Sequence, residues 1–482
     1  MSAGWEMVVG LEVHVQLKTD TKAFCRCSTS FGDPPNTHTC PVCLGLPGAL
    51  PVLNAHAVEL AMRAALALGC TVHGRSIFAR KNYFYPDLPK GYQISQFDKP
   101  LATGGELEID VDGATRRIGI TRVHMEEDAG KSIHDRYVGA TAIDLNRAGV
   151  PLIETVSEPD MRSSAEAGAY LRLLKQIMEY TDVSDVSMEE GSLRVDANVS
   201  ARRVGDTKLG TKTEVKNLNS FSAVERALDA EFTRQVAALE AGEKIEQMTL
   251  LWDGAKGEVR PARSKEGSHD YRYFPEPDLP PLVLAPAAVD ACRSSLPELP
   301  RARRARFETA YGISAKDAAV LTATHSLGGY YEAVARAAGD GKAAANWVMT
   351  EVLAIANAEK RDLRRFAEDP PLAADRLAAL VALVKTGTIS GSAAKQVFAE
   401  MRASKDQPRA IAERLNLLQV GDDAQLGRWV DEVFAENPNE AERFAGGERK
   451  LQGVLVGLIM KKSQGRADPK KVNQLLSARV RS

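Results

Sequence analysis

Two side chains that bind divalent metals lie two residues apart near the N-terminus of this 482-residue chain. Over residues 8–17 aliphatic side chains alternate with polar ones, which predicts a strand with Glu12, His14 and Gln16 on its polar face. A carboxylate and an imidazole placed side by side suit a divalent cation. A water-facing strand would show the same alternation, so this pair alone leaves both interpretations open.

Other predicted strands carry charged side chains in the same pattern. Arg122, His124 and Glu126 alternate along one segment, which runs into the carboxylates of Glu127 and Asp128. Consecutive carboxylates repel one another unless a cation offsets their charge. Two more segments repeat the alternation: Arg194, Asp196 and Asn198, then Lys212, Glu214 and Lys216. Each could simply face water, but several such strands in one domain favour a shared polar basin.

Cations and aromatic rings are interleaved in residues 80–87 and 270–275. Tyr83, Tyr85 and Arg272 could stack on a base or hold a phosphate, which suits a nucleotide or an RNA end. Lys265 belongs to a segment with the character of a mobile loop and is a further phosphate ligand to consider. Ordinary packing of the rings, with the cations extending to solvent, explains the composition equally well.

Four cysteines, Cys25, Cys27, Cys40 and Cys43, form a C-x-C and a C-x2-C pair separated by twelve residues. In a reducing compartment this spacing predicts a tetrahedral zinc site. Four thiolates would complete the coordination shell, so the zinc would be structural. Reduced cysteines in a loop are the alternative. Cys70 and Cys292 are isolated, and we expect each to be a small buried apolar residue.

The composition is that of an ordinary soluble protein, with 44% hydrophobic residues, 26% charged residues and a formal net charge of −2. No apolar run approaches a membrane-spanning length, and the first residues lack the order of a signal peptide. We therefore expect a cytoplasmic protein. The chain contains no P-loop motif, so any ATP site would be of another kind. A serine-rich amidase stretch and a cysteine-led glutaminase signature are also missing from the sequence.

The pattern predicts an α+β protein. We expect strands near 8–17, 105–111, 115–124, 192–200 and 210–217, and helices at 55–68, 164–180 and 222–241. Asp112-Gly113 predicts a hairpin. After a proline-rich stretch the spacing becomes helical to the end of the chain. The last 35 residues contain nine basic and two acidic side chains, a net charge of +7, which could attract phosphate backbones or form a solvated helix face.

Several long segments resemble the B subunit (GatB) family of tRNA-dependent amidotransferases. These segments are GLEVH at 10–14, RKNYFYPDLPKGYQISQ at 80–96, HMEEDAGK at 124–131, LNRAGVPLIETVSEPD at 145–160, residues 191–198 and DYRYFPEPD at 270–278. The family converts misacylated Glu-tRNA(Gln) or Asp-tRNA(Asn) to the amide form. The resemblance implies a mixed-sheet cradle domain with a kinase-like site at 1–294, containing a zinc insert at 25–43, then an all-α helical domain at 295–404 and an all-α, tRNA-binding tail at 405–482.

The resemblance also implies cofactors and partners. Glu12, His14, Glu127 and Glu154 would hold Mg²⁺, and Glu126 could share or exchange the role of its neighbour. ATP would phosphorylate the misacylated residue, and Zn²⁺ would occupy the cysteines. The partners would be the amidase (glutaminase) A subunit, which releases ammonia, the small C subunit and the tRNA. The residues expected to contact phosphate or the acceptor end of the tRNA are Lys81, Arg194, Lys212 and Lys216.

Two other functions compete with this one. A non-catalytic tRNA-binding scaffold would explain the basic tail and the aromatic segments, but not carboxylates gathered near RNA phosphates. A freestanding glutamine-dependent ligase would need a glutaminase nucleophile, which the sequence does not present.

Overall fold

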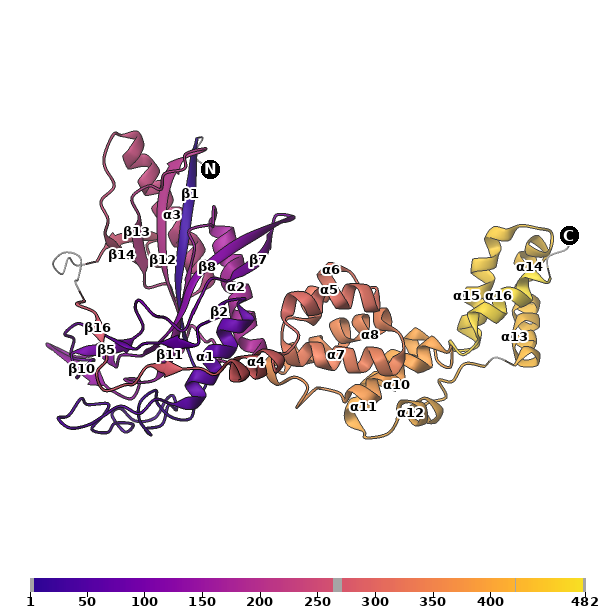
Figure 1. The fold of residues 1–482 in the computed structure, drawn as a ribbon. Helices are drawn as coiled ribbons and strands as arrows, with labels where there is room; N and C mark the ends of the chain where they lie inside the picture. The colour runs from indigo at the N-terminus through magenta and orange to yellow at the C-terminus, as the bar shows by residue number, and fades with distance from the viewer. Residues whose placement is uncertain (1–3, 263–270, 421, 480–482) are drawn as a thin grey trace. The chain divides into compact units, whose positions relative to one another are not determined.

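The computed structural model describes residues 4–262, 271–420 and 422–479. The chain forms two compact units, Met1–Leu299 and Pro300–Ser482 (Figure 1). Lys265, one of the predicted phosphate ligands, lies outside the described residues.

A ten-stranded mixed sheet is the framework of the first unit. Its order is β15-β14-β13-β12-β1-β11-β8-β6-β2, with β7 paired to β8, and all pairs are antiparallel except β13 with β14. The strands are β1 (Trp5–Gln16), β2 (Thr71–Val72), β6 (Ala102–Thr103), β7 (Glu106–Val111), β8 (Ala114–Glu127), β11 (Pro151–Ser157), β12 (Leu193–Arg203), β13 (Thr213–Lys216), β14 (Thr249–Asp253) and β15 (Glu258–Pro261). The predicted α+β class with a mixed sheet is confirmed.

The two faces of the sheet differ as the alternation in β1 predicts. Val9, Leu11, Val13 and Val15 are buried in the core of the first unit. The helices α1 (Ala55–Ala67), α2 (Ser164–Tyr180) and α3 (Phe221–Glu240) contribute to the same core (Figure 1). Because neighbouring residues of a strand point to opposite faces, the charged residues between these aliphatic ones are left on the other face.

Local signals in the sequence place the ends of these elements. Asn54 accepts hydrogen bonds from the first turn of α1, and Gly69 follows that helix with a φ of 74°. Ser163 caps α2 by accepting a hydrogen bond from the backbone N–H of Glu166. In a standard capping box the Glu166 side chain would accept from the N–H of Ser163, but here it accepts from the N–H of Arg162. Asp112-Gly113 joins β7 to β8 as predicted, and both residues have positive φ, as a tight hairpin turn requires.

Shorter strands complete the first unit. β4 (Ala79–Asn82) lies between β5 (Tyr92–Ser95) and β16 (Phe274–Pro275). The other pairs are β9 (Lys131–Tyr137) with β10 (Ala140–Asp144) and β3 (Arg75–Ser76) with β17 (Leu282–Val283), and α4 (Pro286–Ser294) follows. None of these short strands was predicted from the sequence.

The second unit is helical and has two hydrophobic cores. The first core runs from Phe307 to Ala412 and the second from Leu426 to Leu476. Its helices are α5 (Pro300–Tyr311), α6 (Ala315–Leu321), α7 (His325–Ala338), α8 (Gly341–Trp347), the π-helix η1 (Val348–Val352), α9 (Leu353–Ala358), η2 (Leu363–Arg365), α10 (Ala374–Lys385), α11 (Gly391–Ala403), α12 (Pro408–Arg414), α13 (Asp423–Glu436), α14 (Pro438–Ala445), η3 (Arg449–Leu451), α15 (Gln452–Lys462) and α16 (Pro469–Ser477). The tail was predicted to begin at residue 405. Helix α12 lies after that residue but packs in the first helical core. Among the described residues, no helix is both long and apolar enough to cross a bilayer.

Candidate functional site

Strand register gathers side chains that are far apart in the sequence. His14 on β1 is paired with Glu154 on β11, and Glu154 is paired with His124 on β8. On its other side His14 is paired with Arg194 of β12. Side chains at directly paired positions project from the same face of a sheet. The polar faces predicted one strand at a time therefore form one surface.

His14, Glu126 and Glu154 form the first cluster on this surface. Their ligand atoms all lie within 4.8 Å of one another. His14 Nε2 is 3.2 Å from Glu154 Oε2 and 4.0 Å from Glu126 Oε2. His124 Nε2 lies 3.1 Å from Glu126 Oε1, which ties the two histidines and two carboxylates together. One imidazole with two carboxylates is a donor set that suits a divalent cation.

The histidines and carboxylates of the first cluster stabilise one another in their charged forms. Burial alone would lower the pKa of His14, but the hydrogen bond to Glu154 and the charges of Glu154 and Glu126 raise it. Burial raises the pKa of Glu126, but His124, Lys81 and His14 outweigh it and the net shift is downward. The pKa of Glu154 is also lowered, against the effect of burial, by His124 and His14. Both carboxylates are therefore ionised and buried.

Side chains from the short β4–β5 sheet support Glu126. Ser95 donates to Glu126 Oε1 at 2.7 Å, and Gln93 donates to Glu126 Oε2 at 3.2 Å. No pattern in the sequence points to these two residues, because β5 is too short to show an alternation. Lys81 is partly buried, which would lower its pKa, but the charges of Glu126, Tyr273 and Glu154 raise it. Its ammonium lies 4.9 Å from the centre of the Tyr271 ring.

Glu12 belongs to a second cluster, with Asp196 and Glu214. Burial and then the charges of Glu154 and Glu214 raise the pKa of Glu12. Lys216 offsets part of this charge, since its Nζ lies 2.8 Å from Asp196 and 3.0 Å from Glu214. The structure thus brings all four polar strands together but divides their carboxylates between two adjacent groups.

Glu127, a predicted metal ligand, points away from both clusters. Its Oε1 accepts from the backbone N–H of Ile94 at 2.9 Å and contacts the ammonium of Lys90. Glu126 and Glu127 are consecutive in β8, so their side chains leave opposite faces of the strand. Arg194, a predicted phosphate ligand, donates to buried Asp128 at 2.9 Å. We assign Glu127 to the contact between β8 and β5.

The aromatic segments predicted to bind a base come together. The ring centre of Tyr83 lies 6.1 Å from that of Tyr85 and 6.2 Å from that of Tyr271. Tyr273 is stacked on Phe97 at 4.3 Å. Arg272 lies between Tyr271 and Tyr273 in the chain and has a backbone φ of 44°. The charges of Lys81 and Glu126 act on the pKa values of Tyr83 and Tyr273, so these two rings lie near the first cluster on the side of Lys81.

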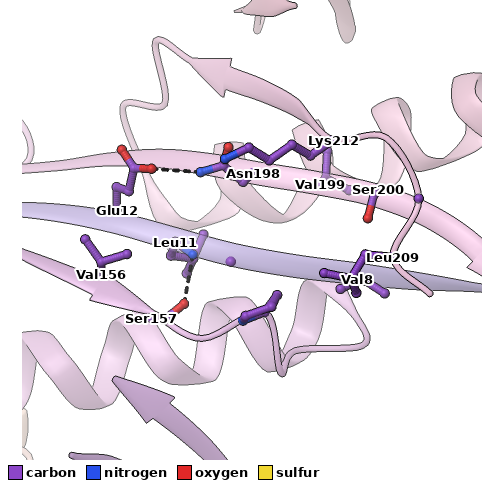
Figure 2. Close-up of a pocket in the computed structure, with 13 residues that line it drawn as sticks. Val8, Leu11, Glu12, Val156, Ser157, Asn198, Val199, Ser200, Leu209 and Lys212 are labelled. Atoms are coloured by element: carbon purple, nitrogen blue, oxygen red, sulfur yellow. Dashed lines mark hydrogen bonds between the residues drawn. The ribbon is translucent and has the colours of Figure 1, made fainter. Parts of the chain in front are cut away.

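A hollow of about 280 Å³ lies on the opposite flank, beside Glu12 (Figure 2). Its lining residues are Val8, Gly10, Leu11, Glu12, Val156, Ser157, Pro159, Asn198, Val199, Ser200, Leu209, Gly210 and Lys212. Asn198 donates to Glu12 Oε1 at 3.0 Å at one end. The Lys212 side chain extends toward Asn198 (Figure 2). The hollow is thus mainly apolar with a charged end.

The four predicted zinc ligands meet at one point. Cys43 Sγ lies 3.5 Å from Cys25, 3.7 Å from Cys40 and 3.8 Å from Cys27. These separations are too long for disulfides but match the roughly 3.8 Å edge of a tetrahedron with zinc–sulfur bonds of about 2.3 Å. The hydrogen bond from Cys25 lowers the pKa of Cys43 to about 4, and Lys22 acts in the same direction. The cysteines therefore fit a structural zinc ion.

Lys22, which no motif in the sequence marks, supports this interpretation. It is fully buried, and its ammonium donates to the carbonyls of His38 at 2.7 Å and Leu145 at 3.2 Å and lies 3.5 Å from Cys43 Sγ. A buried cation needs a compensating negative charge. A zinc tetrathiolate carries a charge of −2 and would provide it. The isolated Cys70 and Cys292 are buried, as predicted.

Comparison with known proteins covers nearly the whole chain. A family model described as the GatB/GatE catalytic domain matches residues 7–290, and one described as the GatB domain matches residues 329–480. Three relatives are named as B subunits of aspartyl/glutamyl-tRNA(Asn/Gln) amidotransferase. They come from Geobacter sulfurreducens (52% identity over 480 residues, 99% of each chain), Moorella thermoacetica (53% over 478 residues, 99% of this chain and 100% of the relative) and Carboxydothermus hydrogenoformans (52% over 475 residues, 98% of each).

Proposed function

The chain belongs to the GatB family of amidotransferase B subunits, and from this premise we propose that it is the B subunit of a tRNA-dependent amidotransferase. Its substrate would be Glu-tRNA(Gln), Asp-tRNA(Asn) or both, and its product the corresponding amide. The observation that carries the catalytic role is the cluster of His14, Glu126 and Glu154 on the polar face of the sheet. It lies within the segment that matches the catalytic domain.

The chemistry that this role requires explains the need for ATP. The side-chain carboxylate of the misacylated residue is a poor acyl donor because its leaving group would be oxide. A carboxylate oxygen attacks the γ-phosphorus of ATP, ADP leaves, and an acyl phosphate forms. Ammonia then attacks the acyl carbon, inorganic phosphate leaves, and one proton is lost to give the amide. No step needs a nucleophile from the protein.

We propose that His14, Glu126 and Glu154 hold Mg²⁺, with Glu12 in the adjacent cluster. The bound Mg²⁺ would neutralise charge on the phosphate oxygens. The side chains of these residues are already held in position by their neighbours. Ser95 and Gln93 donate hydrogen bonds to Glu126, and His14 contacts Glu154. Glu127 is not among the proposed ligands, because its carboxylate contacts Lys90 and the backbone of β5.

The predicted cations have different surroundings, which suggest different tasks. Lys81 lies by the first cluster and the aromatic rings, so we assign it to the phosphate or the acceptor end of the tRNA. Lys216 is held between Asp196 and Glu214, which suits a positioning role for that cluster. Lys212 borders the hollow and is available for a phosphate. Arg194 is held by Asp128 beside His14.

Partner proteins would complete the reaction. Ammonia must arrive unprotonated and sheltered from water, so we propose the glutaminase A subunit and the small C subunit as partners. The net positive charge of the last 35 residues supports a tRNA-binding role for the tail. Zinc would be structural, and we place the protein in the cytoplasm, where protein synthesis proceeds.

An assay of the assembled complex tests this function against a scaffold role. The complex is mixed with each misacylated tRNA, ATP and ammonium chloride, without glutamine, and amide formation and ADP release are measured. We expect both products, with Mg²⁺ required. A Glu154→Gln variant should lose both while a Glu243→Gln variant, changed at an exposed carboxylate, retains them. Full activity of the Glu154→Gln complex would show that this chain is a scaffold.

A further inference from the structure

The segment that joins β10 to β11, residues 145–150, leads directly into the first cluster. We call this segment the connector. Glu154 is the fourth residue of β11, which begins immediately after it. The last two residues of the connector exchange two backbone hydrogen bonds of 2.8 Å with Asp128, just beyond the end of β8. Both carboxylates of the first cluster, Glu126 and Glu154, therefore lie within a few residues of a point that the connector holds.

The cysteine-rich insert, residues 25–43, supplies hydrogen bonds to the connector. Asn36 Oδ1 accepts from the backbone N–H of Leu145 at 2.8 Å. Asn146 reaches in the other direction, since its Oδ1 accepts from the N–H of His38 at 2.9 Å and its Nδ2 donates to the carbonyl of Pro34 at 2.8 Å. The connector lies outside regular strands, so its backbone groups depend on such side chains for hydrogen-bond partners.

Lys22 joins the connector to the cysteine cluster itself. Its buried ammonium lies 3.5 Å from Cys43 Sγ and donates to the carbonyl of Leu145 at 3.2 Å. The next residue, Ala23, donates its backbone N–H to the carbonyl of Gly149 at 2.8 Å. The chain beside the cysteines is thus bonded to the connector near both of its ends.

We propose that the zinc-binding insert is a brace for the first carboxylate cluster, and that Asn36 and Asn146 are positioning residues that act on Glu154 through the connector. The inference rests on the proposed function and adds that zinc bound at the insert raises the affinity of the first cluster for its metal. Zinc in a closed tetrathiolate shell takes no part in the chemistry and serves by fixing the loop that holds it. A fixed loop fixes the entry of β11, and metal affinity depends on how firmly the ligands are held.

A zinc site that only stabilises its own loop makes a different prediction. The insert contributes no strand to the ten-stranded sheet, so loss of zinc would then leave the affinity of the first cluster unchanged. Thr37 provides the matched control, because its Oγ1 donates to the carbonyl of Pro34 at 2.8 Å, a bond that stays inside the insert. Thr37→Ala removes a hydrogen bond of the loop without touching the connector.

The test measures binding of Mn²⁺ to the full chain, at the site that Glu154→Gln removes. Mn²⁺ shares the preference of Mg²⁺ for carboxylate ligands. The double variant Asn36→Ala with Asn146→Ala should retain zinc by elemental analysis but bind Mn²⁺ about fivefold more weakly, less than the roughly tenfold or greater loss expected on removing a direct outer-shell partner. Thr37→Ala should bind Mn²⁺ like the wild type. The unfolding temperature shows that each variant is folded.

Removal of zinc with a chelator is an independent arm of the test. Zinc-free wild-type protein should show the same weakening of Mn²⁺ binding, and return of zinc should reverse it. Removal of zinc from the double asparagine variant should add little, because both changes act through one connector. A purely structural role would not produce this non-additivity. If the zinc-free chain does not stay folded, the asparagine variants decide alone.

Several outcomes would overturn the inference. Unchanged Mn²⁺ affinity in the folded asparagine variant contradicts it, as does full affinity in folded, zinc-free wild-type protein. Additive losses would mean that zinc and the asparagines act separately, and loss of zinc from the asparagine variant would assign these residues to zinc binding alone. If the wild-type chain has no Mn²⁺ site that depends on Glu154, the proposed function itself fails, which is a distinct result.

Discussion

His14 Nε2 and Glu154 Oε2 lie 3.2 Å apart, on two strands that are hydrogen-bonded in antiparallel register. Glu154 is buried, and His14 faces the same side of the sheet as Arg194 and His124. The contact joins an N-terminal strand to one that follows it by well over a hundred residues. It is the geometric basis of the proposed Mg²⁺ site.

Loss of the β1 ligands should remove catalysis without removing the tRNA. Glu12→Gln combined with His14→Ala is expected to reduce ATP-dependent phosphorylation of Glu-tRNA by more than about 100-fold, beyond the effect of changing an outer-shell partner. The affinity for tRNA should remain, because neither residue belongs to the tail. Glu59→Gln with His56→Ala is a matched control, since it removes an exposed Glu–His pair on α1. Unchanged phosphorylation in the β1 variant would refute the metal assignment.

Removal of two thiols should release zinc. Cys40→Ser with Cys43→Ser breaks the tetrahedral set, and metal-binding free energy contributes to folding free energy. We expect zinc content to fall to background by elemental analysis and the unfolding temperature to drop by roughly 5 °C. Cys292→Ser, at an isolated buried cysteine, should retain zinc. If the wild-type protein contains no zinc, the assignment is wrong.

The charge of Lys22 should matter for retention of zinc. Lys22→Met keeps most of the apolar length but removes the ammonium beside Cys43, so transfer of zinc to a chelator should be about tenfold faster, the typical effect of an outer-shell change. Lys18→Met is the control, because Lys18 is exposed and pairs with exposed Asp182. Equal release rates for the two variants would mean that the thiolates do not depend on Lys22.

Deleting the tail should weaken tRNA binding and reduce its dependence on salt. A cut at residue 408 would remove α12, which packs in the first helical core, so a deletion of residues 422–482 is the better choice. Fewer phosphate contacts give a shallower slope of log affinity against log salt concentration. The measurement is a tRNA titration at several salt concentrations, with zinc content as the check that the first unit is intact. Full affinity in the truncated protein would count against a tRNA-binding tail.

Glu332 predicts an acid-sensitive contribution to the stability of the second unit. Burial raises its pKa, but hydrogen bonds from Arg306 and Tyr311 and the nearby positive charges lower it from 4.5 to about 2. A lowered folded-state pKa stabilises the fold above 4.5, and this contribution disappears as pH falls from about 4.5 to about 2. In urea unfolding, Glu332→Gln should be less stable than wild type near neutral pH, with a difference that shrinks on acidification. A difference that is constant with pH would exclude this linkage.

The sequence by itself determined the features that depend on neighbours along the chain. The alternation in β1 placed Glu12 and His14 on a polar face because side chains in a strand alternate with period two. The hairpin at Asp112-Gly113 and the cap at Asn54 follow from local backbone preferences. The spacing of the four cysteines likewise predicted their meeting point, since both pairs lie in one short segment.

Only the tertiary structure decided which strands are neighbours. The order of the sheet places β11 between β1 and β8, and no local pattern in the sequence states that order. Alternation in β8 already puts Glu126 on the face of His124 and Glu127 on the other face, but only the order of the sheet brings that polar face beside His14. Gln93 and Ser95 reach Glu126 from a strand too short to show a period. Pairing between distant segments depends on the packing of the whole sheet. The alternation within a strand is visible in the sequence, but the strand order that brings the site residues together is not.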